Sequence, residues 1–136
     1  MNQSEVEAFV SKLDNVQRDD SYGYAMYFVG DEHLVPFVSI ASSDNEYDSV
    51  SNLNREGIYR INIGVGRETF DSLVGNMKLE DIDYSTLDVL MPHPEYAKQH
   101  FVCILNPSGE NEELTKKLIT EAHDLAANRL ERKANR

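Results

Sequence analysis

The chain has 136 residues, of which 40% are hydrophobic and 27% charged, as in an ordinary soluble globular protein. Its formal net charge is −11, but four of the 13 basic residues and only one of the 24 acidic residues lie at 129–136. The first 128 residues therefore hold nine basic and 23 acidic side chains, a net charge of −14, which disfavours general nucleic-acid binding, and we expect no nucleic-acid partner.

No apolar run approaches the ~20 residues that a bilayer span needs, so we expect no membrane segment and no membrane partner. The amino-terminal residues lack the basic and apolar stretches of a signal peptide. The lone cysteine, Cys103, cannot form an intrachain disulfide and suits a reducing compartment. We therefore expect a cytoplasmic protein that is a monomer or weak dimer. We also expect a single domain over 1–136, with a basic tail at 129–136 that can fray.

The first predicted element is a helix near the amino terminus. Ser4 as N-cap and Glu7 at the third helical position fit a capping box. Apolar residues then recur at helical spacing on one face: Val6, Phe9, Val10 and Leu13. The pattern predicts a helix that ends near Asn15.

Two strands and a polar segment come next. The aromatic-rich run Tyr22–Val29 predicts a strand, and Phe37–Ala41, which follows Pro36, predicts a second. The short connection between them favours an antiparallel hairpin. The polar segment 42–54 is either an exposed loop or a loop with one short helical turn.

The centre of the chain joins a strand to a helix. Arg60 and Asn62 share one face of Ile58–Ile63 and apolar residues fill the other, so we expect a half-buried strand. The sequence Gly-Val-Gly at 64–66 interrupts this strand. Helical spacing then resumes from Arg67 and stops at Gly75.

The remaining elements complete the predicted fold. Tyr84–Leu90 predicts a short helix closed by a proline, and Phe101–Leu105 predicts a strand. Glu113–Leu130 predicts a long amphipathic helix, whose main stripe is Leu114, Leu118, Ala122, Leu125 and Arg129. The order of elements predicts an α+β fold, a mainly antiparallel sheet with the amino- and carboxy-terminal helices packed on it.

Two segments carry unusual motifs. Gly57–Phe70 reads GIYRINIGVGRETF, and Pro92–Pro107 contains Pro-His-Pro-Glu-Tyr, Gln99 and Val-Cys-Ile-Leu-Asn-Pro. With Glu-Ala-His at 121–123, these motifs resemble a group of small bacterial proteins known only as a conserved domain of unknown function. The resemblance covers residues 22–130, although many of these proteins have Trp where this chain has Phe101. It implies no activity.

The order of elements is also similar to that of the MmcQ/YjbR proteins, small α+β domains often described as DNA-binding. The shared features are a strand that leads into a helix, a strand near a histidine and aromatics, and a long final helix. The similarity implies an antiparallel sheet flanked by helices. It says little about function, because a fold alone does not fix activity, and the acidic charge here contradicts DNA binding.

The Gly64–Gly66 turn has two interpretations. Its backbone amides, assisted by Arg67, suit an anion at the start of the following helix. The turn lacks the third glycine of a dinucleotide fingerprint and the lysine of a P-loop. We therefore favour a tight turn whose glycines allow a positive φ or close packing.

His93, held between two prolines, is a candidate general base. Its expected neighbours, if the last helix packs over this loop, are Arg60, Tyr96 and His123. The alternative, which we favour, is a rigid loop histidine whose ring nitrogens bond to the backbone.

No metal site is predicted. Zinc needs four ligands in suitable geometry, and His100 and Cys103 would face opposite sides of a strand. The acidic residues at 80–83 lack the spacing of a calcium loop. We therefore expect no metal and no cofactor.

Two functions stay open. The first is a non-catalytic domain that binds a small molecule or a protein, and we favour it because no catalytic motif is complete. The second is an enzyme with a histidine base and an arginine anion anchor, its reaction unknown. In either case we expect the site where the 64–67 turn meets the 92–96 loop. The candidate ligand-binding residues are Arg60, Arg67, His93, Tyr96 and His123.

Overall fold

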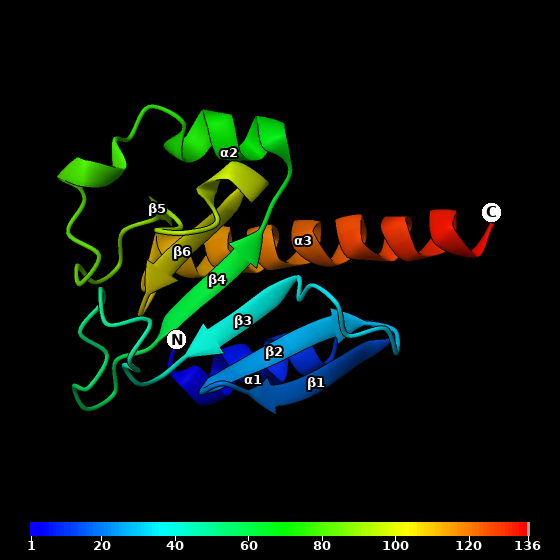
Figure 1. The fold of residues 1–136 in the computed structure, drawn as a ribbon, viewed down its shortest axis with the longest axis horizontal. Helices are drawn as coiled ribbons and strands as arrows, with labels where there is room; N and C mark the ends of the chain where they lie inside the picture. The colour runs from blue at the N-terminus through cyan, green and yellow to red at the C-terminus, as the bar shows by residue number, and fades with distance from the viewer. Residues whose placement is uncertain (136) are drawn as a thin grey trace.

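The computed structural model describes residues 1–135, and this part of the chain forms one six-stranded sheet with helices packed on it (Figure 1). The strands are β1 (Val16–Ser21), β2 (Tyr24–Val29), β3 (Val38–Ala41), β4 (Arg60–Gly64), β5 (Met91–Pro92) and β6 (Phe101–Leu105). They pair antiparallel in the order β1-β2-β3-β4-β6-β5. The helices are α1 (Gln3–Ser11), α2 (Arg67–Val74) and α3 (Glu110–Ala134), and the 3₁₀ turns are η1 (Leu79–Asp81) and η2 (Ala97–Gln99). The α+β fold class predicted from the sequence is confirmed.

Helix α1 begins and ends earlier than the sequence predicted. Asn2, and not Ser4, is its N-cap: the Asn2 side chain accepts from the Glu5 N–H at 2.9 Å, and the Glu5 carboxylate accepts from the Asn2 N–H at 3.1 Å. Two overlapping capping boxes exist in this segment, and the first one forms. The helix stops at Ser11, and Asn15, with a positive φ of 58°, turns the chain into β1.

Strand β1 was not predicted, because it is charged and lies at an edge of the sheet. A two-residue turn, Tyr22–Gly23, joins it to β2 with positive φ at both positions, which suits a tight antiparallel hairpin. The predicted helix at Tyr84–Leu90 is wrong. Asp88 has a φ of 60° there, and its carboxylate accepts hydrogen bonds from the N–H and hydroxyl of Ser108 at 2.9 and 2.8 Å.

The main core lies between the sheet and the layer formed by α1 and α3. The sheet contributes Ala25, Tyr27, Val38, Ile40, Ile61, Ile63, Val102 and Ile104, and the two helices contribute Val6, Val10, Leu118, Ile119 and Ala122. The predicted stripe of α3 is confirmed at its centre, where Leu118 and Ala122 are buried. Leu114 and Leu125 at its ends are half-buried.

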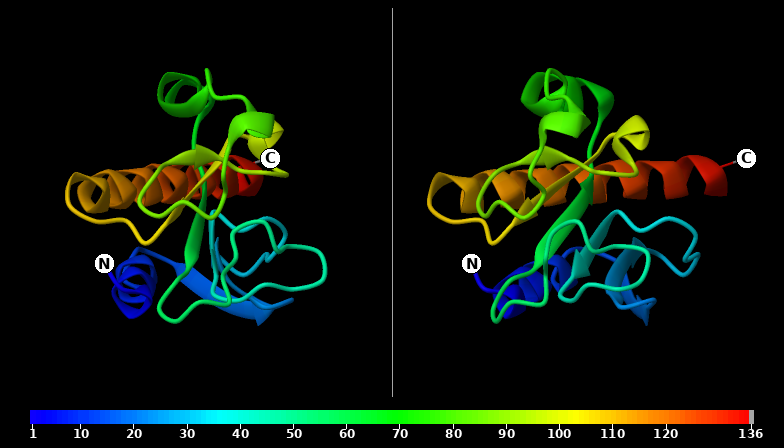
Figure 2. Two further views of the ribbon diagram at one scale, coloured as in Figure 1. Left: turned by 90° about the vertical axis from the view of Figure 1, so that its left-hand side faces the viewer. Right: turned by 60° about the vertical axis from the view of Figure 1, so that its left-hand side comes forward.

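The opposite face of the sheet is covered, over β4, β6 and β5, by segment 42–58 and by the segments before and after β5, 76–90 and 93–100. Figures 1 and 2 show 42–58 and 76–90 gathered at the end of the sheet away from the tip of α3. A second apolar cluster lies beneath them, made of Ala41, Leu53, Tyr84, Met91, Cys103 and Leu105. As a result Arg60 and Asn62 are only 0% and 3% exposed, and the prediction of a half-buried strand is wrong.

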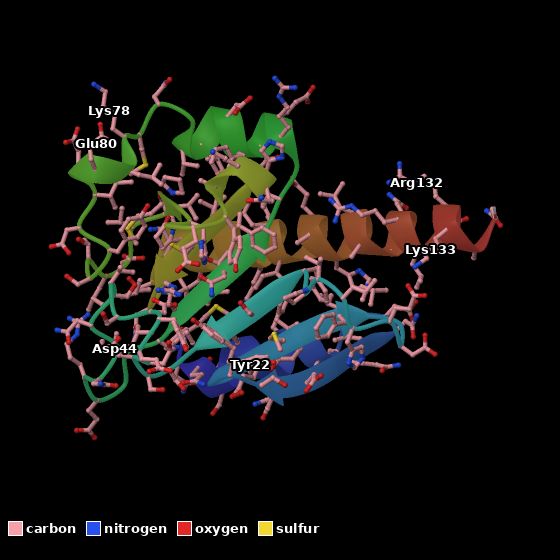
Figure 3. All side chains as sticks on the ribbon, in the orientation of Figure 1. Tyr22, Asp44, Lys78, Glu80, Arg132 and Lys133 are labelled. Atoms are coloured by element: carbon pink, nitrogen blue, oxygen red, sulfur yellow. The ribbon has the colours of Figure 1, made fainter. Side chains whose placement is uncertain are left out.

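Helix α3 extends well past the sheet (Figure 1). Arg132 and Lys133 lie on this extension, far from Asp44 and Glu80 at the other end of the molecule (Figure 3). Helical structure thus continues through most of the basic tail, while Arg136 lies outside the described residues. Among residues 1–135, no helix combines the length and hydrophobicity that a bilayer span needs.

Candidate ligand-binding site

Arg60 is the centre of a buried polar network on the loop-covered face. Its Nη1 and Nη2 donate to the Asp48 carboxylate at 3.2 and 2.5 Å, its Nε donates to Asn62 at 2.9 Å, and its Nη1 also donates to Ser51 at 2.9 Å. The Tyr24 hydroxyl donates to the same carboxylate at 2.6 Å. Because Asp48 and Ser51 come from segment 42–58, the network fixes this loop to the sheet.

The charges of this network neutralise each other. Burial opposes ionisation of Asp48, but the hydrogen bonds from Arg60 and Tyr24 outweigh it and hold the pKa of the carboxyl below its ordinary value. Burial likewise opposes the charge of Arg60, and the bonds to Asp48 outweigh it, so the Arg60 pKa is raised. Arg60 is therefore a cation already paired with an internal carboxylate, which makes it a poor anchor for an external anion.

His93 lies on the same face and is 6% exposed. Its Nδ1 accepts hydrogen bonds from the backbone N–H groups of Glu95 and Tyr96, both at 3.0 Å. The Tyr96 ring lies beside it, with centroids 5.0 Å apart, and Phe101 meets it edge-on at 6.5 Å. The imidazole thus organises the loop around itself and supports Phe101.

These contacts determine the protonation of His93. Two N–H donors at Nδ1 require its lone pair, so the ring proton resides on Nε2. Burial, aided by the charge of Arg60, lowers the His93 pKa to about 4, and the ring is neutral near pH 7. The other ring nitrogen, Nε2, bonds to no group of the described residues. It reaches solvent, because among these residues the only fully buried side-chain polar atom without a partner is Thr115 Oγ1. It can donate a hydrogen bond there, but it cannot accept one.

The Gly64–Arg67 turn is capped from within the chain. The Gly66 N–H donates to Glu121 Oε2 at 2.8 Å, and the Thr69 hydroxyl donates to Glu121 Oε1 at 2.7 Å. A carboxylate from α3 thus occupies the start of α2, where an external anion would have to bind. The Arg67 side chain is 80% exposed and lies 3.8 Å from the Asp71 carboxylate.

His123 lies on the other side of the sheet, among the helices. Its Nε2 is 2.6 Å from the Asp14 carbonyl oxygen, and its ring meets Phe37 edge-on. The structure thus brings Arg60, His93 and Tyr96 to one face of the sheet. It leaves Arg67 on the outside of α2 and His123 against the core.

A cavity of about 170 Å³ opens where the 64–65 turn meets the start of β6. Its lining residues come from five parts of the fold: Val35, Pro36, Phe37, Gly64, Val65, Gln99, Phe101, Ala126 and Arg129. Phe101 forms one wall because Gly64 has no side chain, and a Cβ at Gly64 would lie 2.9 Å from the phenyl ring.

The polar groups of this cavity are few. The Gly64 N–H bonds to the Phe37 carbonyl at 3.0 Å and the Val65 N–H to the His100 carbonyl at 3.1 Å, so these backbone donors are occupied. Pro36 has no N–H at all. Gln99 and Arg129 supply the polar side chains of the lining.

Sequence reasoning did not select the polar groups of this cavity. Gln99 stood within the motifs but was not among the candidate site residues; the same holds for Glu121, which bonds to the adjacent turn. Arg129 was assigned to the stripe and tail of the last helix. Its place in the cavity could not be predicted, because only the packing of α3 across the sheet brings it beside Val35 and Phe101. Nothing in the loop sequence marks Asp48 as the partner of Arg60.

A wider hollow of about 610 Å³ lies between the start of α1 and residues 53–58. Its arginine, Arg55, donates to the carbonyl oxygens of Asn52, Ser51 and Ser85 at 2.7, 3.1 and 3.1 Å. These bonds occupy the cation of the hollow, whose other charged residue is Glu56, so the smaller cavity is the better candidate site.

The structure is therefore an α+β domain with a small, mostly apolar cavity at one end of its sheet. The chain belongs to a family of unknown function, DUF6194, whose model matches residues 1–135. No curated protein matches the chain, and no solved structure does.

Proposed function

We propose that this chain is a non-catalytic domain that binds a small molecule in the cavity between β4, β6 and α3. The observation that carries the proposal is the cavity, whose volume is about 170 Å³. An apolar protein cavity of ~150 Å³ is large enough to take up benzene. A molecule built on one ring therefore fits.

The character of the walls supports this proposal. Apolar side chains form most of the lining, with two polar side chains at the rim, as in typical small-molecule sites. The rim also contains uncovered apolar surface, because Val35 is 68% exposed and its neighbour Leu34 is 77% exposed. A ligand in the cavity would cover part of this surface, which favours binding.

The enzyme alternative has less support from the geometry. A general base needs a free lone pair and a pKa near the working pH. His93 Nδ1 already accepts two backbone hydrogen bonds, and the pKa of the ring is lowered to about 4. Arg67, the anion anchor of that alternative, is an exposed residue on α2 beside Asp71.

The proposal is tested by filling the cavity from its helical wall. Ala126→Met adds a flexible side chain at a lining position and keeps a good helix former in α3. Ala127→Met adds the same side chain at the next residue, which does not line the cavity, and serves as the matched control. A library of ring-sized fragments is screened against all three proteins by amide chemical-shift mapping.

We expect hits on the wild type that shift the amides of Gly64, Val65 and Phe101. The same hits should bind Ala127→Met and lose binding to Ala126→Met. The proposal is overturned if the library gives no hit at these amides, or if the hits bind the Ala126→Met protein as tightly as the wild type.

A further inference from the structure

We infer that the cavity selects a ring that carries a carboxylate, with Arg129 as the group that pairs with the carboxylate. This inference rests on the proposed function and names its ligand class. Arg129 follows Ala126 by one turn of α3, so the helix presents an apolar wall and a cation to the same cavity. A guanidinium matches the two oxygens of a carboxylate with paired N–H donors.

Arg129 is available for an external anion. In the part of the chain that the structure describes, no carboxylate lies within ion-pair distance of Arg129, whereas Lys133 one turn later pairs with Glu32. Gln99 offers an amide N–H at the same rim, and the nearby backbone donors are occupied. A neutral ring would leave the exposed guanidinium in contact with water alone, whereas a carboxylate on the ligand would pair with it.

The charge distribution favours an anion here, although the chain is acidic. Arg129, Arg132 and Lys133 cluster on the last turns of α3, and Figure 3 shows the last two far from the acidic loop residues Asp44 and Glu80. Two acids on segments that contribute to the site are engaged elsewhere, Glu121 with Gly66 and Thr69, and Glu32 with Lys133. More distant carboxylates are screened, because the Debye length is about 8 Å at physiological salt.

The test compares two probes that share a ring and differ in charge, benzoate and benzyl alcohol. Their dissociation constants are measured by amide chemical-shift titration at pH 7 and 150 mM salt. The proteins are the wild type, Arg129→Gln, and Lys117→Gln as a matched control, because Lys117 is an exposed cation on α3 that does not line the cavity. Ala126→Met reports whether either probe enters the cavity.

We expect benzoate to bind the wild type about tenfold more tightly than benzyl alcohol, an order-of-magnitude figure for one charge-assisted contact. Arg129→Gln should remove this preference without weakening benzyl alcohol, and Lys117→Gln should keep it. If benzyl alcohol binds the cavity and benzoate binds no better, the ligand class is wrong and the proposed function stands. A preference that survives in Arg129→Gln also overturns the inference. If neither probe shifts the cavity amides, this inference falls, while the proposed function is decided by the fragment screen.

Discussion

Replacing Arg60 by methionine should destabilise the protein strongly and in a pH-dependent way. Arg60→Met keeps an unbranched apolar stem but removes the four hydrogen bonds that the guanidinium donates to Asp48, Asn62 and Ser51. The Asp48 side chain, which is 12% exposed, then retains one donor, the Tyr24 hydroxyl. An ionised carboxylate is left in a site built for an ion pair.

The expected loss at pH 7 is about 3–5 kcal/mol of unfolding free energy, the usual cost of removing one partner of a buried ion pair. Replacing both charges, in Arg60→Met with Asp48→Leu, should cost less than the sum of the two single changes, because neither charge is then left alone. Arg67→Met is the matched control. That arginine side chain is 80% exposed, so the same change should cost no more than about 0.5 kcal/mol.

The pH dependence distinguishes this explanation from a simple packing defect. In the wild type the Asp48 pKa is lowered, so its contribution is present above the unfolded-state pKa and is lost as the pH falls through the folded-state pKa. In Arg60→Met burial acts without the opposing guanidinium and raises the Asp48 pKa. Protonation then relieves the buried charge, and the deficit relative to wild type should shrink between pH 7 and pH 5.

Urea unfolding followed by far-UV circular dichroism measures all of these free energies. The comparison uses the difference between variant and wild type at each pH, because His93 titrates in both proteins. Loss of the Arg60 charge also raises the His93 pKa, which shrinks the deficit in the same direction. A loss below about 1 kcal/mol at pH 7, or a deficit equal at both pH values, would refute the reasoning.

Three further predictions concern single groups. The folded-state pKa of His93, measured by NMR of its ring protons, should lie near 4. The unfolding free energy should then fall by roughly 2–3 kcal/mol from pH 6.5 to pH 4, because the unfolded chain binds a proton at His93 that the folded chain does not. A measured His93 pKa near 6.5 would contradict this. Glu121→Ala should cost about 0.5–2 kcal/mol, since it uncaps Gly66 and Thr69, and unchanged urea unfolding would show that the cap contributes nothing. Cys103 is fully buried and burial raises its pKa to about 12, so a thiol reagent should label it only after unfolding, and rapid labelling of the native protein would contradict the burial.

The apolar patterns made much of this fold predictable. Phe101–Leu105 and Arg67–Val74 formed as their sequences indicated. The strand buries a continuous apolar run, and the helix packs Phe70 and Val74 against the core while Leu73 is exposed. Strand β1 escaped prediction since an edge strand is held by hydrogen bonds to β2 and needs little apolar surface. The helix predicted at Tyr84–Leu90 failed because Asp88 bonds to the chain near Ser108, a contact between distant segments.

The candidate site was less predictable for a related reason. The site was expected where the 64–67 turn meets the 92–96 loop, and the cavity shares only Gly64 and Val65 with these two segments. The charged side chains at the turn and at the cavity, however, belong to α3, which is distant in sequence. Glu121 bonds to the turn, and Arg129 lines the cavity. Local sequence indicates that a turn exists, but only tertiary packing shows which side chain fills it.

The two ends of β4 have different roles in this domain, one in stability and the other in the proposed ligand binding. At its first residue, the Arg60 guanidinium donates hydrogen bonds to Asp48 and Ser51 and so holds segment 42–58 in place. That end of the strand therefore contributes to the stability of the fold. At its last residue, Gly64 lets the Phe101 ring pack against the backbone, and both line the cavity together with Arg129, for which residues 1–135 supply no carboxylate partner. If this division is correct, Arg60→Met should lower stability and leave benzoate affinity of the folded fraction unchanged, whereas Arg129→Gln should do the reverse. Parallel losses of stability and affinity in both variants would show instead that the network and the cavity act as one unit.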